Sequence, residues 1–283
     1  MQYLRLSWRV TYGAFRHFLA DDGWAIASHI ALSTLMALFP FMIVVTALAA
    51  FFFGSKDLAD EAARILLEAW PPQVADPISA DITGVLTNVR GDVLTFGVLF
   101  AIYFASSGVE SLRIGLNRAY DMAETKPWWW LRMESIVYVL VAAVAILAFS
   151  FLVVLAPFLL DRLVRVAPQF AAFSGTITFA RYAVAAMVLV IALTLIHSWL
   201  PAGRRSLGEI APGIVATLVL WLIAGAVFGR YLAEYAFAYV SMYAGLASAM
   251  IALIFLYVCA SIFVFGAELN STIAKVRSGI DNQ

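Results

Sequence analysis

Four polar side chains share one face of a stretch that is otherwise largely apolar. Ser106, Glu110, Arg113 and Asn117 are spaced at i, i+4, i+7 and i+11, which places them on one side of a helix. At this spacing, the carboxylate of Glu110 can pair with the guanidinium of Arg113. The stripe could contact a charged or zwitterionic substrate, or Glu110 and Arg113 could form a structural ion pair at the membrane interface. The spacing leaves both interpretations open.

Further polar groups lie in other apolar stretches. His29 could carry a proton near neutral pH, although a ring satisfied by a backbone carbonyl is the alternative. Pro40, in the same stretch, is expected to kink or locally break its helix and so act as a hinge. Glu268 and Asn270 close the last apolar stretch, where Glu268 could meet basic residues of the second one or could simply be solvated. We add His29, Glu268 and Asn270 to the candidate substrate-binding residues.

The sequence contains none of the common catalytic or metal-binding motifs. It has no HExxH, no GxSxG and no Walker loop, and its three histidines, His17, His29 and His197, are widely separated. The single cysteine, Cys259, excludes an intrachain disulfide and a cysteine-based zinc cluster. We therefore expect a protein that is not an enzyme and that carries no cofactor and no metal.

The composition is that of a membrane protein. Of the 283 residues, 64% are hydrophobic and 13% are charged, whereas soluble domains have about 25% charged residues. The formal net charge is zero, so no overall basic surface for nucleic acid is expected.

Six stretches are long enough to cross a hydrocarbon core of about 30 Å as helices. They cover approximately residues 24–53, 93–117, 135–160, 177–200, 210–233 and 244–268. The second has a short apolar part, so its helix is expected to continue through the polar stripe. Because lipid cannot satisfy open strand edges, the sequence predicts an all-α polytopic fold in a single integral membrane domain spanning 1–283.

The distribution of basic residues predicts the orientation. With the N-terminus inside, eleven Lys and Arg residues fall in cytoplasmic segments and six on the opposite side. This bias favours a bacterial inner-membrane protein with both termini in the cytoplasm. Residues 54–92 would then be periplasmic, and their apolar spacing predicts short amphipathic helices, with a purely structural lid as the alternative.

Two local patterns predict how the helices meet lipid and one another. Trp128, Trp129 and Trp130 follow Pro127 directly before the third stretch, where aromatic rings settle at the headgroup level. Gly225 and Gly229 form a small-xxx-small pair that would let another helix approach closely.

Four longer stretches resemble the YihY/BrkB family of inner-membrane proteins. They are LSTLMALFPF from Leu32, SSGVESLRIGLNRAYD from Ser106, APGIVATLVLW from Ala211, and YAGLASAMIALIFLYVCASIFVFGAELN from Tyr243. The similarity covers about residues 24–275 and implies six membrane helices and an envelope role, with movement of a lipid-like molecule suspected. The positions that match the family are Pro40, Ser107, Arg113, Asn117, Arg118, Gly213, Gly245, Glu268 and Asn270.

The resemblance has two qualifications. Where many members have two aromatic residues in the first span, this chain has Leu32 and Ser33, so a substrate contact through such rings cannot be carried over. The family's older label of ribonuclease is not supported by this sequence, which shows neither a metal-binding carboxylate cluster nor a basic groove for RNA.

Two functions from different classes follow from these observations. The first is a transporter or lipid flippase-like protein whose first, second and sixth helices surround a polar cavity, with membrane lipids as partners and a lipid or amphiphile as substrate. The alternative is a scaffold for the envelope that does not transport and acts through residues 54–92. A membrane-embedded hydrolase is least favoured, because no nucleophile and base can be paired. The sequence leaves the oligomeric state open.

Overall fold

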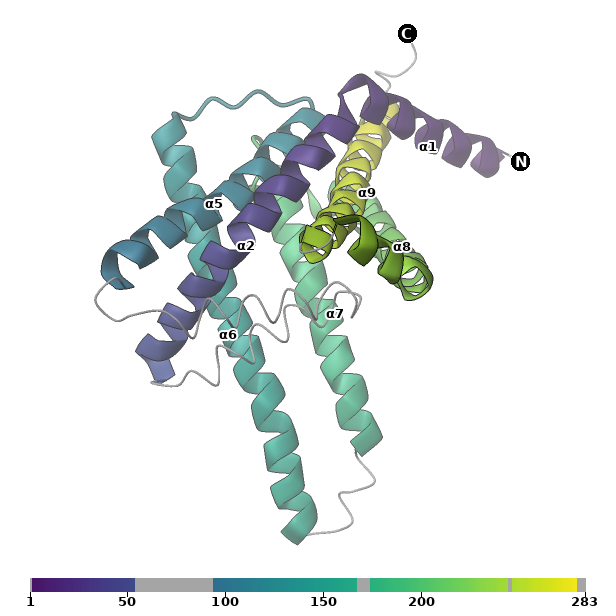
Figure 1. Ribbon diagram of the computed structural model, residues 1–283. Helices are drawn as coiled ribbons and strands as arrows, with labels where there is room; N and C mark the ends of the chain where they lie inside the picture. The colour runs from purple at the N-terminus through teal and green to yellow at the C-terminus, as the bar shows by residue number, and fades with distance from the viewer. Residues whose placement is uncertain (1, 54–93, 167–173, 244–245, 279–283) are drawn as a thin grey trace.

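The regular structure is entirely helical in the residues that the computed structural model describes, which are 2–53, 94–166, 174–243 and 246–278. The helices are α1 (Gln2–Ala20), α2 (Gly23–Phe53), α5 (Leu94–Ala119), α6 (Trp128–Val166), α7 (Ser174–Trp199), α8 (Leu207–Tyr243) and α9 (Ala247–Arg277) (Figure 1). The amphipathic helices expected in 54–92 lie outside the described residues.

Within the described residues, five helical segments are long and apolar enough to cross a membrane. They are Gly23–Val45, Gly97–Ala119, Trp128–Phe149, Leu207–Tyr235 and Ala247–Arg277. In α7, where a further span was expected, the apolar stretch Ala183–Trp199 is shorter. The predicted class, an all-α membrane protein with several apolar helices, is confirmed, whereas the count of six spans is not.

The chain connections 21–22, 120–127 and 200–206 gather at one end of the bundle, near both termini (Figure 1). We call this the polar end. The first two spans are antiparallel there, since Gly115 of α5 packs against Ile26 and Ile30 of α2, and Gly108 packs against Ala37. The helix of the second stretch does continue through the polar stripe, because α5 ends only at Ala119.

Helix α1 is an amphipathic helix that the hydropathy of the sequence did not reveal. Its outer face carries exposed apolar side chains, those of Trp8, Tyr12, Phe15 and Leu19, at a spacing of four, three and four residues. On another face, Ala14 and Phe18 are buried, and Gly13 packs closely against Thr272 of α9. One face of α1 is thus fixed to the bundle, and an apolar face remains exposed.

Helices α8 and α9 approach each other closely at two glycines, Gly213 and Gly266. A side-chain carbon on Gly213 would collide with the backbone oxygen of Gly266 and with the side chain of Asn270. Gly225, which the sequence suggested for such a contact, has nothing within 4 Å of the position where a side-chain carbon would lie. No helix in the described part of the chain makes this contact at Gly225, and a close approach at the Gly225–Gly229 pair stays a prediction.

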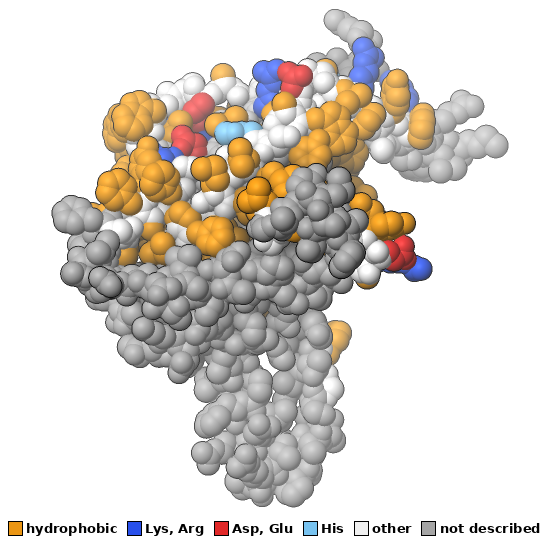
Figure 2. Space-filling view, in the orientation of Figure 1, with side chains coloured by type: hydrophobic (Ala, Val, Ile, Leu, Met, Phe, Trp, Pro, Cys, Tyr) orange, Lys and Arg blue, Asp and Glu red, His pale blue; other side chains and the backbone are white. Residues whose placement is uncertain are grey.

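The remaining surface of the spans is apolar, as lipid requires. Leu222 of α8 is 76% exposed, and the charged side chains visible in Figure 2 lie mostly toward the polar end. Pro40 lies inside α2, which runs unbroken from Gly23 to Phe53. The expected break at Pro40 is absent, and its role as a hinge stays a prediction.

Candidate functional site

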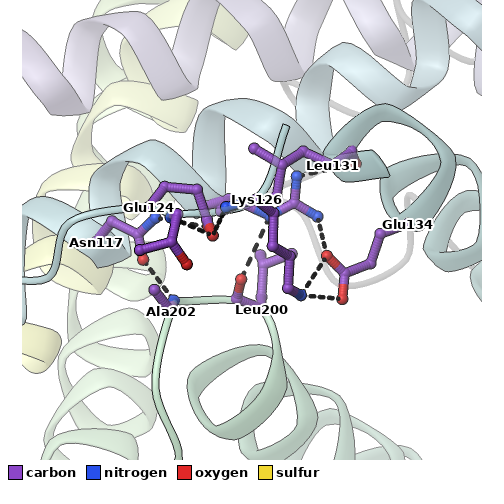
Figure 3. Close-up of polar contacts among 9 residues, drawn as sticks. Asn117, Glu124, Lys126, Leu131, Glu134, Leu200 and Ala202 are labelled. Carbon is purple, nitrogen blue, oxygen red and sulfur yellow. Dashed lines mark hydrogen bonds and ion pairs between the residues drawn. The ribbon is translucent and has the colours of Figure 1, made fainter. Parts of the chain in front are cut away.

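Arg113 is the centre of a polar network that connects three helices at the polar end. Its side chain is only 2% exposed. Its Nε donates to the backbone oxygen of Leu200 at 3.3 Å, and its Nη1 donates to that of Leu131 at 3.0 Å. Its Nη2 pairs with the carboxylate of Glu134 at 3.4 Å (Figure 3). Arg113 thus fastens α5 to the start of α6 and to the residue that follows α7.

Asn117 extends the same network by one helical turn. Its Oδ1 accepts a hydrogen bond from the backbone N–H of Ala202 at 2.7 Å, and its Nδ2 donates to Glu124 at 3.3 Å (Figure 3). Lys126 approaches both carboxylate oxygens of Glu134 at 3.1 Å. The amide of Asn117 therefore holds the 120–127 and 200–206 connections in place.

Glu110 does not pair with Arg113. Its carboxylate instead pairs with Arg132 of α6, so the expected ion pair within α5 is replaced by one between two helices. Arg132 also donates to the hydroxyl of Ser107 at 3.2 Å and lies over the ring of Tyr103 at 3.8 Å. The pair within α5 is absent because α6 places Arg132 beside Glu110 and Glu134 beside Arg113.

This cluster is balanced in charge but uneven in exposure. Three basic residues, Arg113, Lys126 and Arg132, accompany three acidic ones, Glu110, Glu124 and Glu134. The Glu110 side chain is 36% exposed and that of Arg132 is 12% exposed. Ser106, by contrast, is fully buried and donates to the backbone oxygen of Tyr103 in its own helix. The stripe is therefore turned inward at Ser106 and Arg113 and partly outward at Glu110.

The other candidate residues lie apart from this network. His29 is exposed on α2. Glu268 is buried at 2% exposure, and its Oε1 has no hydrogen-bond partner among the described residues. Asn270 is buried and bonds to α8 and to the 120–127 connection: its Oδ1 accepts from the backbone N–H of Gly213 at 2.6 Å, and its Nδ2 donates to the Tyr120 hydroxyl at 3.2 Å.

A pocket of about 430 Å³ opens beside Asn270 at the polar end. It lies between the 200–206 connection, the start of α8 and the last turns of α9. Its charged lining residues are Arg204, Arg205, Glu209 and Lys275. Burial raises the pKa of Tyr120, another lining residue, to about 12, so its hydroxyl keeps its proton at neutral pH.

Sequence reasoning missed the α6 partners and the pocket. Arg132 and Glu134 lie in the first turns of α6, directly after three tryptophans, and two charges there are costly enough to suggest partners on a neighbouring helix. Tyr120 and Arg205 carry no such signal, because they meet only through the folding of two connections. Nothing in the structure tests a binding role for the predicted residues.

The described residues contain no group of three or more His, Cys, Asp or Glu side chains that could hold a metal ion.

Comparisons with known proteins agree on one family. The profile of the virulence factor BrkB family matches residues 14–283. The ribonuclease-like protein YfkH of Bacillus subtilis is 26% identical over 266 residues, which are 92% of this chain and 94% of that protein. The UPF0761 membrane protein RC1_0578 of Rhodospirillum centenum is 25% identical over 276 residues, 94% of this chain but 59% of that protein. No solved structure matches. The chain belongs to the virulence factor BrkB family of membrane proteins.

Proposed function

We propose that this protein is a transporter or lipid flippase-like protein of the bacterial inner membrane that moves a lipid or another amphiphile. The observation that carries the proposal is the ion pair between Glu110 and Arg132, which is partly exposed although both residues lie within candidate membrane spans. Glu110 precedes the end of its span at Ala119 by nine residues, or roughly 13 Å along a helix.

Charged side chains at that depth are costly and commonly line the path of a substrate. Around the Glu110–Arg132 pair lie the hydroxyl of Ser107 and the exposed ring of Tyr103. Together they form a polar spot on an apolar surface, which suits a headgroup crossing beside acyl chains.

Helix α1 supports a function at a lipid surface. Its exposed apolar side chains are flanked by Arg9 and Arg16, which are also exposed. An amphipathic helix with this arrangement is suited to lie in the plane of the membrane, with its arginines near anionic headgroups. The excess of basic residues on the segments of the polar end favours a cytoplasmic position for this end.

The test is the movement of fluorescent phospholipids across proteoliposomes that contain the purified protein. Glu110→Gln and Arg132→Gln are each expected to slow lipid movement at least about tenfold. The matched control is Glu234→Gln, because Glu234 forms an exposed ion pair with Arg230 on α8. Lipid movement that is unchanged in both variants of the Glu110–Arg132 pair would contradict the proposal. If the folded wild-type protein moved no lipid at all, the scaffold function acting through residues 54–92 would be favoured instead.

A further inference from the structure

The pocket at the polar end has an excess of positive charge. Arg204 and Arg205 come from the 200–206 connection, and Lys275 comes from the last turn of α9. None of the three makes a salt bridge with a carboxylate in the part of the chain that the structure describes. The one acidic lining residue, Glu209, accepts a hydrogen bond from the backbone N–H of Ser206 at 2.9 Å.

Two donors of the pocket, Arg205 and Tyr120, are held in place before any ligand binds. The guanidinium of Arg205 lies 3.8 Å from the ring centre of Tyr120 and donates to the backbone oxygen of Ala202 at 3.2 Å. Tyr120 in turn accepts a hydrogen bond from Asn270, which leaves the phenolic proton free to be donated. A guanidinium fixed in this way loses little further freedom when it binds an oxyanion.

The size and position of the pocket indicate which anion would fit. About 430 Å³ is far more than a water molecule or a halide needs, and it admits a phosphate group with a substituent. The lining residues lie in the last two turns of the candidate span Ala247–Arg277, just beyond the end of Gly97–Ala119, and around the start of Leu207–Tyr235. This is the level at which lipid phosphates lie if these spans cross a bilayer.

We propose that this pocket binds a phosphate group, through Arg204, Arg205, Lys275 and the hydroxyl of Tyr120. The phosphate would come from a phospholipid headgroup or from a soluble phosphate. The lipid source rests on the proposed function, whereas the anion site itself does not. Binding of the headgroup here would place it at one end of the bundle before or after it passes Glu110.

The experiment titrates the full-length protein, in neutral detergent, with inorganic phosphate and separately with short-chain phosphatidylglycerol, by calorimetry. Arg204→Gln and Lys275→Gln each remove one positive charge from an outer wall of the pocket and are expected to weaken binding about tenfold. Glu209→Gln removes the one negative charge, keeps an acceptor for Ser206, and is expected to strengthen binding. The control is Arg118→Gln, because Arg118 is an exposed cation of the polar end that does not line the pocket.

The pattern across these variants decides the proposal. If Arg204→Gln and Lys275→Gln weaken binding, Glu209→Gln strengthens it and Arg118→Gln leaves it unchanged, the site is supported. A phosphatidylglycerol affinity well above that for phosphate then identifies the lipid source, and similar affinities identify a soluble phosphate. Equal binding in all variants, or no binding by the wild type, overturns the site. If lipid movement is retained in that case, only the anion site fails. If binding is retained without lipid movement, only the proposed function fails.

Discussion

Arg113 and Arg205 lie at the same end of the helical bundle but in opposite surroundings. Arg113 is buried, and its guanidinium donates to two backbone oxygens and one carboxylate. Arg205 lies against an aromatic ring, donates to the backbone oxygen of Ala202 at 3.2 Å, and lines a pocket. An arginine whose N–H donors are used within the fold, such as Arg113, joins helices. An arginine with donors left over beside a pocket, such as Arg205, is available to bind a ligand.

The largest effect is expected when the centre of the closed network is removed. Arg113→Ala leaves the backbone oxygens of Leu131 and Leu200 without this donor and removes one of the two cations beside Glu134, which keeps Lys126. We expect a loss of about 3 kcal/mol in the free energy of unfolding, because two backbone oxygens lose their donor and a buried ion pair is broken. Unfolding in sodium dodecyl sulfate, followed by tryptophan fluorescence, measures this.

The control for this prediction is Arg118→Ala. Arg118 is 57% exposed and forms a single ion pair with Asp21 at 3.5 Å, so its removal should cost less than about 1 kcal/mol. Similar losses in the two variants would show that Arg113 is not the fastening that its contacts indicate.

A smaller loss is expected where α8 and α9 meet below the pocket. Gly213→Ala adds a carbon that would collide with Gly266 and Asn270, and such overpacking costs about 2 kcal/mol. Gly225→Ala is the matched control, because the added carbon would meet no atom within 4 Å. The same unfolding measurement checks both variants, and equal stability of the two would contradict the observed crossing of the helices.

Asn117→Ala should have a still smaller effect. It removes the acceptor of the Ala202 N–H and the donor to Glu124, and a loss of about 1 kcal/mol is typical of such bonds. Ser261→Ala is a suitable control, since the Ser261 hydroxyl bonds only to Tyr257 in its own helix. An Asn117 variant as stable as the Ser261 variant would mean that the two connections do not depend on this amide.

The smallest effect on stability is expected in the pocket. Arg204→Gln and Lys275→Gln remove charges that have no carboxylate partner among the described residues, so the free energy of unfolding should change by less than about 0.5 kcal/mol. Thermal unfolding of both variants without added anion measures this. A loss of stability comparable to that of Arg113→Ala would erase the distinction between the closed network and the open pocket.

The helical class and the face of the polar stripe were predictable because both depend on periodicity within a single helix. The partner of Glu110 was not predictable in this way. A pair with Arg113 inside α5 satisfies local spacing, but α6 supplies Arg132 from 22 residues away. Pairs within a helix contribute only about 0.2–0.5 kcal/mol, so packing between helices readily decides which partner is used.

The close contact between Gly213 and Gly266 and the amphipathic first helix were not predicted, for similar reasons. The spacing of Gly225 and Gly229 shows only that a helix could approach there, whereas the observed approach uses one glycine on each of two helices, Gly213 and Gly266. Helix α1 escaped detection because its apolar residues are spread over one face and its mean hydropathy is low. A pocket formed by two connections and a helix end leaves no periodic signal at all.

Asn270 connects the pocket to the contact between α8 and α9. Its amide accepts from the backbone of α8 at one end and donates to Tyr120 at the other. If separating α8 from α9 shifts Tyr120 and weakens the binding of a ligand in the pocket, thermodynamic reciprocity requires that the bound ligand oppose this separation by the same free energy. A ligand bound in the surface pocket would thereby change the stability of the buried contact between α8 and α9.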